Sequence, residues 1–229
     1  VPGALHEAWG AAAPAVQPGR RRHARGPTAA CLGPRDVATR LDGVVRALQS
    51  VMLERAAALE SVLMPSYTHL QRAIPVSGAH WMLSHFWPLE RDRARNASAS
   101  RSAAVLPLGS GAIAGCAFPI SRVLLQGSLG FSSVSQNSID AVGDRDFVAE
   151  LLFTVAMTAA HLSRLAEDLI IYGSSEFGFV QFGDAFTTGS SMMPQKRNPD
   201  ALELARGSGA RAIGDLTPPR RSEGRRRGP

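Results

Sequence analysis

The sequence predicts an all-α protein, a bundle of long helices formed by residues 36–217. Apolar side chains recur every three to four residues through two long segments, the spacing that places them on one face of a helix. Alanine and leucine, both strong helix formers, are abundant in the middle of the chain. Apolar residues make up 45% of the 229 residues and aromatic ones only 6%. We therefore expect a substantial core built mainly from aliphatic side chains.

The first half of the chain predicts two long helices after an irregular start. Residues 1–35 are rich in alanine, proline, glycine and arginine and have no helical or strand period, so we expect a disordered segment unrelated to the helical domain. A long helix is expected from residue 36 to the neighbourhood of Pro65, then a loop over residues 67–72 and a second helix after Pro75. The apolar positions of the two helices are Leu41, Val44, Val45, Leu48, Val51, Met52, Leu59 and Val62, then Trp81, Leu83, Phe86 and Leu89.

The second half continues the helical pattern. Residues 105–117 are glycine-rich and predict a loop, and a short helix is expected over residues 122–129. The segment 147–172 is apolar on nearly all sides of a helix, which is typical of a helix at the centre of a bundle. A last helix over residues 200–216 is weakened by three glycines, and residues 218–229 form an irregular, arginine-rich tail.

The net charge of +6 arises at the two ends of the chain. Four arginines within residues 20–25 and five within residues 220–227 supply it, so the part between them has no net positive charge. Without a basic face interleaved with aromatics, we expect no nucleic-acid partner. Charged residues interrupt the apolar runs and no signal peptide is apparent, so we expect no membrane partner and a cytoplasmic protein. Cys31 and Cys116 lie in dissimilar segments, which favours free thiols over a disulfide.

The segment Thr187–Asp200 carries the densest set of groups suited to chemistry. Gly189 and the two serines after it allow backbone N–H groups to point inward, while Lys196 and Asn198 supply donors for an anion. Pro199 suits the first turn of a helix, and a helix N-terminus favours negative charge. The sequence therefore predicts an anion-binding loop that leads into a helix.

This loop resembles the signature loop of the fumarase/aspartase superfamily, G-S-S-x-M-P-x-K-x-N. Ser66–Ala73 is similar to that superfamily's Y-T-H-L-Q-x-A segment, and Val105–Gly115 to its L-P-L-G-S-G-A-x-A-G segment. Asn137–Asp140 follows at the family's spacing. The glutamine between the proline and the lysine of the loop, Gln195, makes this loop similar to that of the argininosuccinate lyases and their lens relatives, the delta-crystallins. The resemblance covers roughly residues 36–217.

The resemblance implies an activity and an assembly. Argininosuccinate lyases carry out a β-elimination that splits argininosuccinate into arginine and fumarate, as part of arginine biosynthesis and the urea cycle, and they use no cofactor. Members of the family form homotetramers around a helical core, and each active site is shared by three subunits. A lone chain of this kind is therefore expected to be inactive.

The resemblance also assigns roles to individual residues. The family's catalytic serine falls on Ser190, its catalytic histidine on His69, and the carboxylate that pairs with that histidine on Glu203. A carboxylate fixes the imidazole tautomer and raises its basicity. Lys196 holds the substrate carboxylate and the charge that develops during the reaction. Whether Ser190 or His69 acts as the base stays open. The substrate-binding positions are Thr68, Arg145, Gln195 and Asn198.

Four of these residues have an ordinary structural alternative, and for Lys196 it is a solvated loop lysine. A loop serine such as Ser190 often accepts nearby backbone N–H groups, and a loop histidine such as His69 is more often structural than catalytic. Arg145 has acidic neighbours, Asp144 and Asp146, with which to form an ion pair. No group of residues has metal-ligand spacing, so no metal is expected.

One family motif is missing. The family carries G-x-S-R-N-D-Q before its first long helix, where this chain reads Leu32-Gly33-Pro34-Arg35-Asp36-Val37-Ala38-Thr39. The flanking domains of the family are also not recognisable, which predicts a truncated lyase of low or no activity. Two alternatives remain: a catalytically inactive structural protein like a delta-crystallin, and another fumarate-releasing lyase such as adenylosuccinate lyase, against which Gln195 argues.

Overall fold

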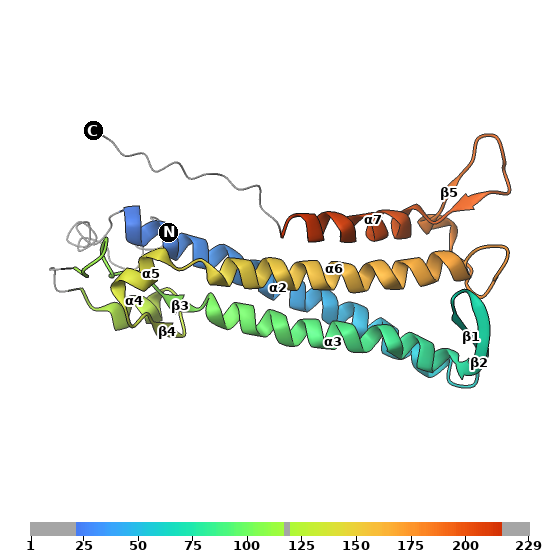
Figure 1. The fold of residues 1–229 in the computed structure, drawn as a ribbon, viewed down its shortest axis with the longest axis horizontal. Helices are drawn as coiled ribbons and strands as arrows, with labels where there is room; N and C mark the ends of the chain where they lie inside the picture. Colours follow the sequence, from blue (N-terminus) through green and yellow to red (C-terminus); the bar gives the residue numbers. More distant parts are fainter. Residues whose placement is uncertain (1–21, 117–119, 217–229) are drawn as a thin grey trace. The chain divides into compact units, whose positions relative to one another are not determined.

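The computed structural model describes residues 22–116 and 120–216, and it confirms the all-α, long-helix architecture (Figure 1). The chain divides into two compact units. Among the described residues, unit 1 combines the chain up to Arg46 with Arg93–Leu151, and unit 2 combines Ala47–Asp92 with the residues from Leu152 to Leu216. Among the described residues, the three longest helices are α2 (Arg22–Ala58), α3 (Gly78–Ser102) and α6 (Asp146–Tyr172). Each of these helices contributes residues to both units.

Helix α2 begins earlier than the sequence indicates. The expectation of an irregular segment over residues 1–35 is wrong from Arg22 onward, although Pro27 and Pro34 both lie inside the helix. Burial explains the difference, because every seventh residue of α2 is buried, and tertiary packing outweighs weak local helix propensity. These buried residues are Cys31, Ala38, Val45 and Met52. The expected irregular segments before Arg22 and over residues 218–229 lie outside the described residues.

The first long helix also ends earlier than expected, at Ala58 rather than near Pro65. The chain instead forms strand β1 (Leu63–Thr68), which pairs antiparallel with β2 (Gln71–Ser77). A bulge interrupts the pairing, and the Ser66 hydroxyl donates to the Ile74 carbonyl oxygen at 2.5 Å. Proline is tolerated here because both strands are edges. The loop predicted over residues 67–72 is therefore the end of a β-hairpin.

Unit 1 has an apolar core that holds a glycine-rich loop. The core joins α2, the segment that follows α3, helix α4 (Arg122–Ser128) and the start of α6. Its buried members are Cys31, Ala103, Leu106, Leu108, Leu125, Phe131 and Phe147. Strand β3 (Val105–Leu106) pairs parallel with β4 (Ser133–Val134), and Asn137 caps α5 (Ser138–Gly143). The Arg122 guanidinium donates to the Leu106, Leu108 and Ser135 carbonyl oxygens and to two serine hydroxyls, so one side chain binds both walls of the loop.

Gly111 in this loop is expected to tolerate no side chain. Its φ of +67° is unfavourable for other residues, and a Cβ there would lie 2.0 Å from the Gly115 carbonyl oxygen. Gly111→Ala should lower the free energy of unfolding by at least about 2 kcal/mol, measured by urea unfolding, from the left-handed conformation and the clash together. The control Gly127→Ala lies in helix α4 with open space around it and should be neutral or slightly stabilising. Equal effects for the two would contradict this account of the loop.

Unit 2 is joined by polar contacts between its helices. His85 and His161 each contact a carboxylate on the facing helix, with His85 Nε2 2.9 Å from Asp168 Oδ2 and His161 Nδ1 2.6 Å from Asp92 Oδ2. Helix α7 (Asp200–Gly214) packs on α6 (Figure 1), where Arg206 donates to Glu167 at 2.7 Å. The predicted helices over residues 147–172 and 200–216 are thus confirmed to within two residues.

Helix α6 is the one helix, in the part of the chain that the structure describes, long and apolar enough to cross a membrane by length and composition. The expectation that charges interrupt every apolar run is therefore wrong for this helix. The finding is weak evidence for a membrane span, since the core helix of a soluble bundle passes the same test.

Candidate active site

The signature loop forms a small hairpin in unit 2. Strand β5 (Thr188–Gly189) pairs antiparallel with β6 (Arg197–Asn198), and the residues between them turn back on themselves, with the Lys196 N–H donating to the Met193 carbonyl oxygen at 2.9 Å. A short 3₁₀ helix, η2 (Asp184–Phe186), precedes the hairpin. The Thr188 hydroxyl donates to the Asp200 carboxylate at 2.5 Å, which ties β5 to the first turn of α7. The hairpin is therefore held against a helix N-terminus, as expected.

The Ser190 oxygen lies where two backbone donors meet. It accepts the N–H groups of Met192 at 3.3 Å and of Met193 at 3.2 Å. This is the contact that the structural alternative for Ser190 requires, and it is also the contact that stabilises negative charge on a hydroxyl oxygen. Lys196 is exposed and makes no ion pair within the described residues. Its ammonium group is therefore available for an anion.

His69 lies at the tip of the β1–β2 hairpin. His69 and Leu70 are the two turn residues, and both have positive φ, 54° and 58°. Positive φ at both central positions is the pattern of a type I′ turn, which usually takes glycine or asparagine. A histidine in this conformation is strained by about 1 kcal/mol or more, a feature that often marks functional sites.

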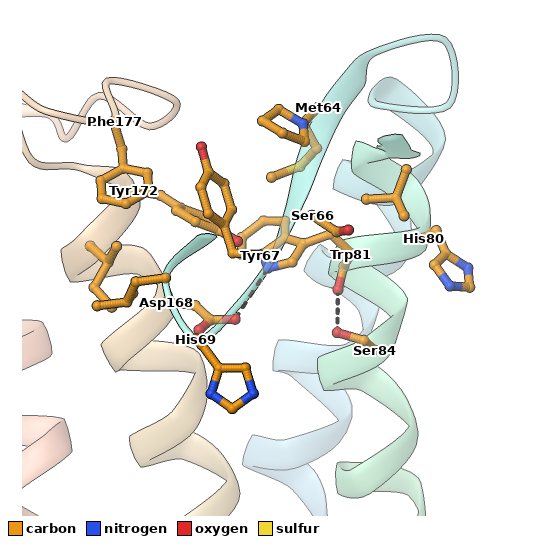
Figure 2. A pocket seen from close by; sticks show the side chains of 14 residues that line it. Met64, Ser66, Tyr67, His69, His80, Trp81, Ser84, Asp168, Tyr172 and Phe177 are labelled. Carbon is orange, nitrogen blue, oxygen red and sulfur yellow. Dashed lines mark hydrogen bonds between the residues drawn. The ribbon is translucent and has the colours of Figure 1, made fainter. Parts of the chain in front are cut away.

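A cavity of about 590 Å³ lies beneath this hairpin, within unit 2 (Figure 2). His69 lines it, together with rings from three segments of the chain and the Asp168 carboxylate. The Trp81 indole donates from Nε1 to Asp168 Oδ2 at 3.2 Å, the same oxygen that contacts His85. The aromatic side chains of the cavity are Tyr67, Trp81, Tyr172 and Phe177.

The pKa of Asp168 is lowered from its ordinary value. Burial alone raises the pKa of this carboxyl group, but hydrogen bonds from His85 and Trp81, with the nearby charges of His85 and Arg164, outweigh burial. Asp168 is therefore a carboxylate at neutral pH. Its lowered pKa means that it stabilises the folded state above the unfolded value of about 3.9 and loses this contribution as the pH falls below that value.

We expect Asp168→Asn to remove this pH dependence. At neutral pH the variant should be less stable than the parent. The difference in free energy of unfolding should shrink as the pH falls below about 4, because the unfolded parent then takes up a proton at Asp168 that the folded parent binds only at lower pH. Urea unfolding at pH 7, 5, 4 and 3 measures the difference. A gap of constant size down to pH 3 would show that Asp168 does not titrate with folding.

The sequence-predicted residues are distributed over several elements of the fold. Ser190, Gln195, Lys196 and Asn198 share one hairpin, while Thr68 and His69 share the other. Glu203 is exposed in the first turn of α7. The pKa of the nearby Arg206 is raised chiefly by its hydrogen bond to Glu167 and by the charge of Glu167, and to a smaller extent by the charge of Glu203. Within the described residues Glu203 makes no hydrogen bond to His69, so the expected pairing is not found inside one chain. Arg145 belongs to unit 1, where its guanidinium donates to the Asp144 and Val142 carbonyl oxygens rather than to a carboxylate.

Sequence reasoning missed the residues that support the hairpin, chiefly Asp168 and Trp81. A signal was available for Asp168, because it and Glu167 form an acidic pair within the apolar helix α6. Both acids contact other elements, Glu167 through Arg206 and Asp168 through Trp81 and His85. Paired charges inside an apolar helix thus mark contacts with neighbouring elements.

Comparison with known proteins decides the family. The sequence profile of the family described as "Lyase" matches residues 15–214. The chain belongs to this lyase family. The match begins at residue 15, so the prediction that residues 1–35 are unrelated to the lyase domain is wrong from that residue onward. The early start of helix α2, at Arg22, agrees with this match.

Relatives of this lyase are named argininosuccinate lyases. The protein from Roseiflexus sp. (strain RS-1) is 53% identical over 212 residues, which are 93% of this chain and 47% of that protein. The protein from Symbiobacterium thermophilum is 53% identical over 173 residues, covering 76% of this chain and 38% of its own length. The chain thus spans about half the length, or less, of these curated relatives.

Solved structures agree on the fold. An EDDS lyase in complex with formate is 30% identical and superposes with a TM-score of 0.86, over 94% of this chain and 43% of that one. The class II fumarase from Schistosoma mansoni is 20% identical and has a TM-score of 0.75, over 88% of this chain and 47% of that one, and shows the fold alone. The long-helix architecture of this lyase is therefore that of the fumarase/aspartase superfamily.

Proposed function

We propose that this lyase contributes to the β-elimination of argininosuccinate, which releases arginine and fumarate without a cofactor. The observation that carries the proposal is the geometry of the signature loop, where two backbone N–H groups converge on the Ser190 oxygen. The choice of argininosuccinate as the substrate is supported by the relatives named argininosuccinate lyase. The choice of fumarate as a product is supported by an EDDS lyase variant that was solved with bound fumarate.

The reaction requires groups of the kinds that the two hairpins carry. A base removes the proton from the carbon beside a carboxylate, the resulting carbanion is stabilised, and the C–N bond breaks so that the guanidinium nitrogen leaves with arginine. The backbone N–H groups of Met192 and Met193 donate to the Ser190 side-chain oxygen and so favour its deprotonated form. Lys196 and Asn198, at the start of helix α7, suit the substrate carboxylate. Either Ser190 or His69 serves as the base, and the other assists departure of the leaving group.

The complete site requires more than one copy of the chain in this proposal. The described residues show no hydrogen bond between Glu203 and His69, so in this proposal a second copy brings a carboxylate to the imidazole. A homotetramer is supported by apolar side chains exposed on the helices, because so many are not normally left in water. They include Val44, Val51 and Leu53 on α2, Leu152 and Phe153 on α6, and Leu204 and Ile213 on α7.

The proposal is tested in a chimera that carries residues 15–214 in place of the matching segment of the Roseiflexus argininosuccinate lyase. Incubation with argininosuccinate should release fumarate, followed by ultraviolet absorbance, and arginine in equal amount. The unextended 229-residue chain should release little or none, because catalysis of this kind depends on positioning. A folded, tetrameric chimera without turnover would contradict the proposal and favour a catalytically inactive, structural protein. Cleavage of adenylosuccinate in place of argininosuccinate would identify the chain as an adenylosuccinate lyase.

A further inference from the structure

We propose that Asp168 is a positioning residue for the β1–β2 hairpin and holds its tip, with His69, in place through Trp81. The role of His69 in the reaction rests on the proposed function, whereas the attachment of the hairpin does not. Nothing in the sequence motifs assigns a role to Asp168 or Trp81.

The hairpin needs an attachment outside itself. A two-stranded hairpin alone is marginally stable in water, and this one carries two residues with positive φ at its turn. A bulge before Tyr67 further interrupts its pairing. Most of its residues from Thr68 to Pro75 are exposed, so the tip gains little from burial. The position of His69 therefore depends on whatever fixes the base of the turn.

Tyr67 provides that attachment. Its ring centroid lies 5.1 Å from that of Phe177 in an edge-to-face arrangement, and 6.2 Å from that of Tyr172. Figure 2 shows the rings of Tyr67, Tyr172 and Phe177 gathered beside the cavity. Such pairs add about 0.5–1.5 kcal/mol each beyond their burial. Since Tyr67 is two residues before His69, the place of its ring sets the place of the turn.

Asp168 fixes the other side of this ring cluster. Trp81 packs against Tyr172 with centroids 5.3 Å apart, and its indole N–H donates to Asp168 Oδ2. The same oxygen lies 2.9 Å from Nε2 of the buried His85. One carboxylate oxygen therefore orients two ring side chains of α3, those of Trp81 and His85. Asp168 and Tyr172 are four residues apart on α6, so they lie on one face of the helix.

Amide hydrogen exchange on the 229-residue chain tests the attachment without any turnover. In Asp168→Ala, amides of β1 and β2 should exchange at least about tenfold faster than in the parent, while amides of α3 around Asp92 keep the parent rate. The matched control is Glu167→Ala, which loses the Arg206 contact and should speed exchange in α7 but not in the hairpin. Parent-rate exchange of the hairpin in Asp168→Ala, or an equal rise throughout unit 2, would overturn the proposal.

Two conservative variants separate positioning from general stability. Trp81→Phe keeps a ring against Tyr172 but removes the donor to Asp168, so it should speed hairpin exchange and add nothing when combined with Asp168→Ala. Asp168→Asn keeps an oxygen acceptor and should restore most of the protection, with the Trp81 indole N–H resonance near its parent position. Independent, multiplying effects of Trp81→Phe and Asp168→Ala would overturn the proposal, even if Asp168→Ala alone folds poorly.

The catalytic consequence is measured separately in the chimera. There Asp168→Ala should lower kcat for fumarate release more than it raises KM, because His69 is misplaced while the anion-binding loop is intact. Faster hairpin exchange with unchanged kcat would uphold the attachment and refute the role of His69. Unchanged exchange would refute the attachment, whether or not argininosuccinate is the substrate.

Discussion

Ser190→Ala is expected to lower fumarate release by the chimera by between about a hundredfold and ten-thousandfold, the usual contribution of a positioned acid or base. The substitution removes the hydroxyl oxygen that accepts the N–H groups of Met192 and Met193, and with it the proposed acid or base. KM should change little, because Lys196 and Asn198, which we propose bind the substrate carboxylate, are retained. The measurement is the initial rate of fumarate absorbance over a range of argininosuccinate concentrations.

Ser191→Ala is the matched control for this prediction. Ser191 is the next residue in the same loop and is exposed. Its removal should leave kcat within about twofold of the parent, since surface substitutions away from special features have small effects. Equal losses for the two serines would mean that the loop needs both hydroxyls for its fold, and the assignment of Ser190 would fail.

Asp92→Ala is expected to have the largest effect on stability among single substitutions. The Asp92 side chain is 1% exposed and lies 2.6 Å from Nδ1 of His161, which is itself 12% exposed. Removing one member of a buried pair leaves the other without its partner, and typically costs on the order of 3–5 kcal/mol. Urea unfolding followed by circular dichroism gives the change in free energy.

Asp42→Ala is the comparison for Asp92→Ala. Asp42 pairs with Arg46 and Arg93, but its side chain is 35% exposed, so its removal should cost about 1 kcal/mol or less. Similar losses for both variants would show that burial does not govern these pairs, and the account of the α3–α6 contact would have to be abandoned.

The long helices were predictable because their signal is local. The apolar residues of α6 and the glycine-weakened pattern of α7 specify helix without reference to distant residues. The start of α2 could not be predicted from local sequence. Its first turns carry two prolines, and they are stabilised by the burial of side chains, which no local pattern displays. The β1–β2 hairpin was missed for a related reason: its turn residues, His69 and Leu70, are not those that a type I′ turn usually takes.

The candidate site was predictable only in its parts. Motif spacing placed Ser190, Lys196 and Asn198 on one loop, and the structure confirms that they share a hairpin. The pairing of His69 with Glu203 stays a prediction, because the described residues show no hydrogen bond between the two side chains. Asp168 carried no motif at all, and its contacts with Trp81 and His85 emerge only when α3 and α6 pack together.

The most direct test of the central claim, that each active site combines residues from different copies, is complementation between two inactive chimeras. One carries Ser190→Ala and the other His69→Ala, and the two are unfolded together and refolded into mixed tetramers. The account predicts fumarate release well above the sum of the separate variants, because some sites then receive both intact side chains. Mixed tetramers, verified by mass, that remain as inactive as either variant would contradict the claim.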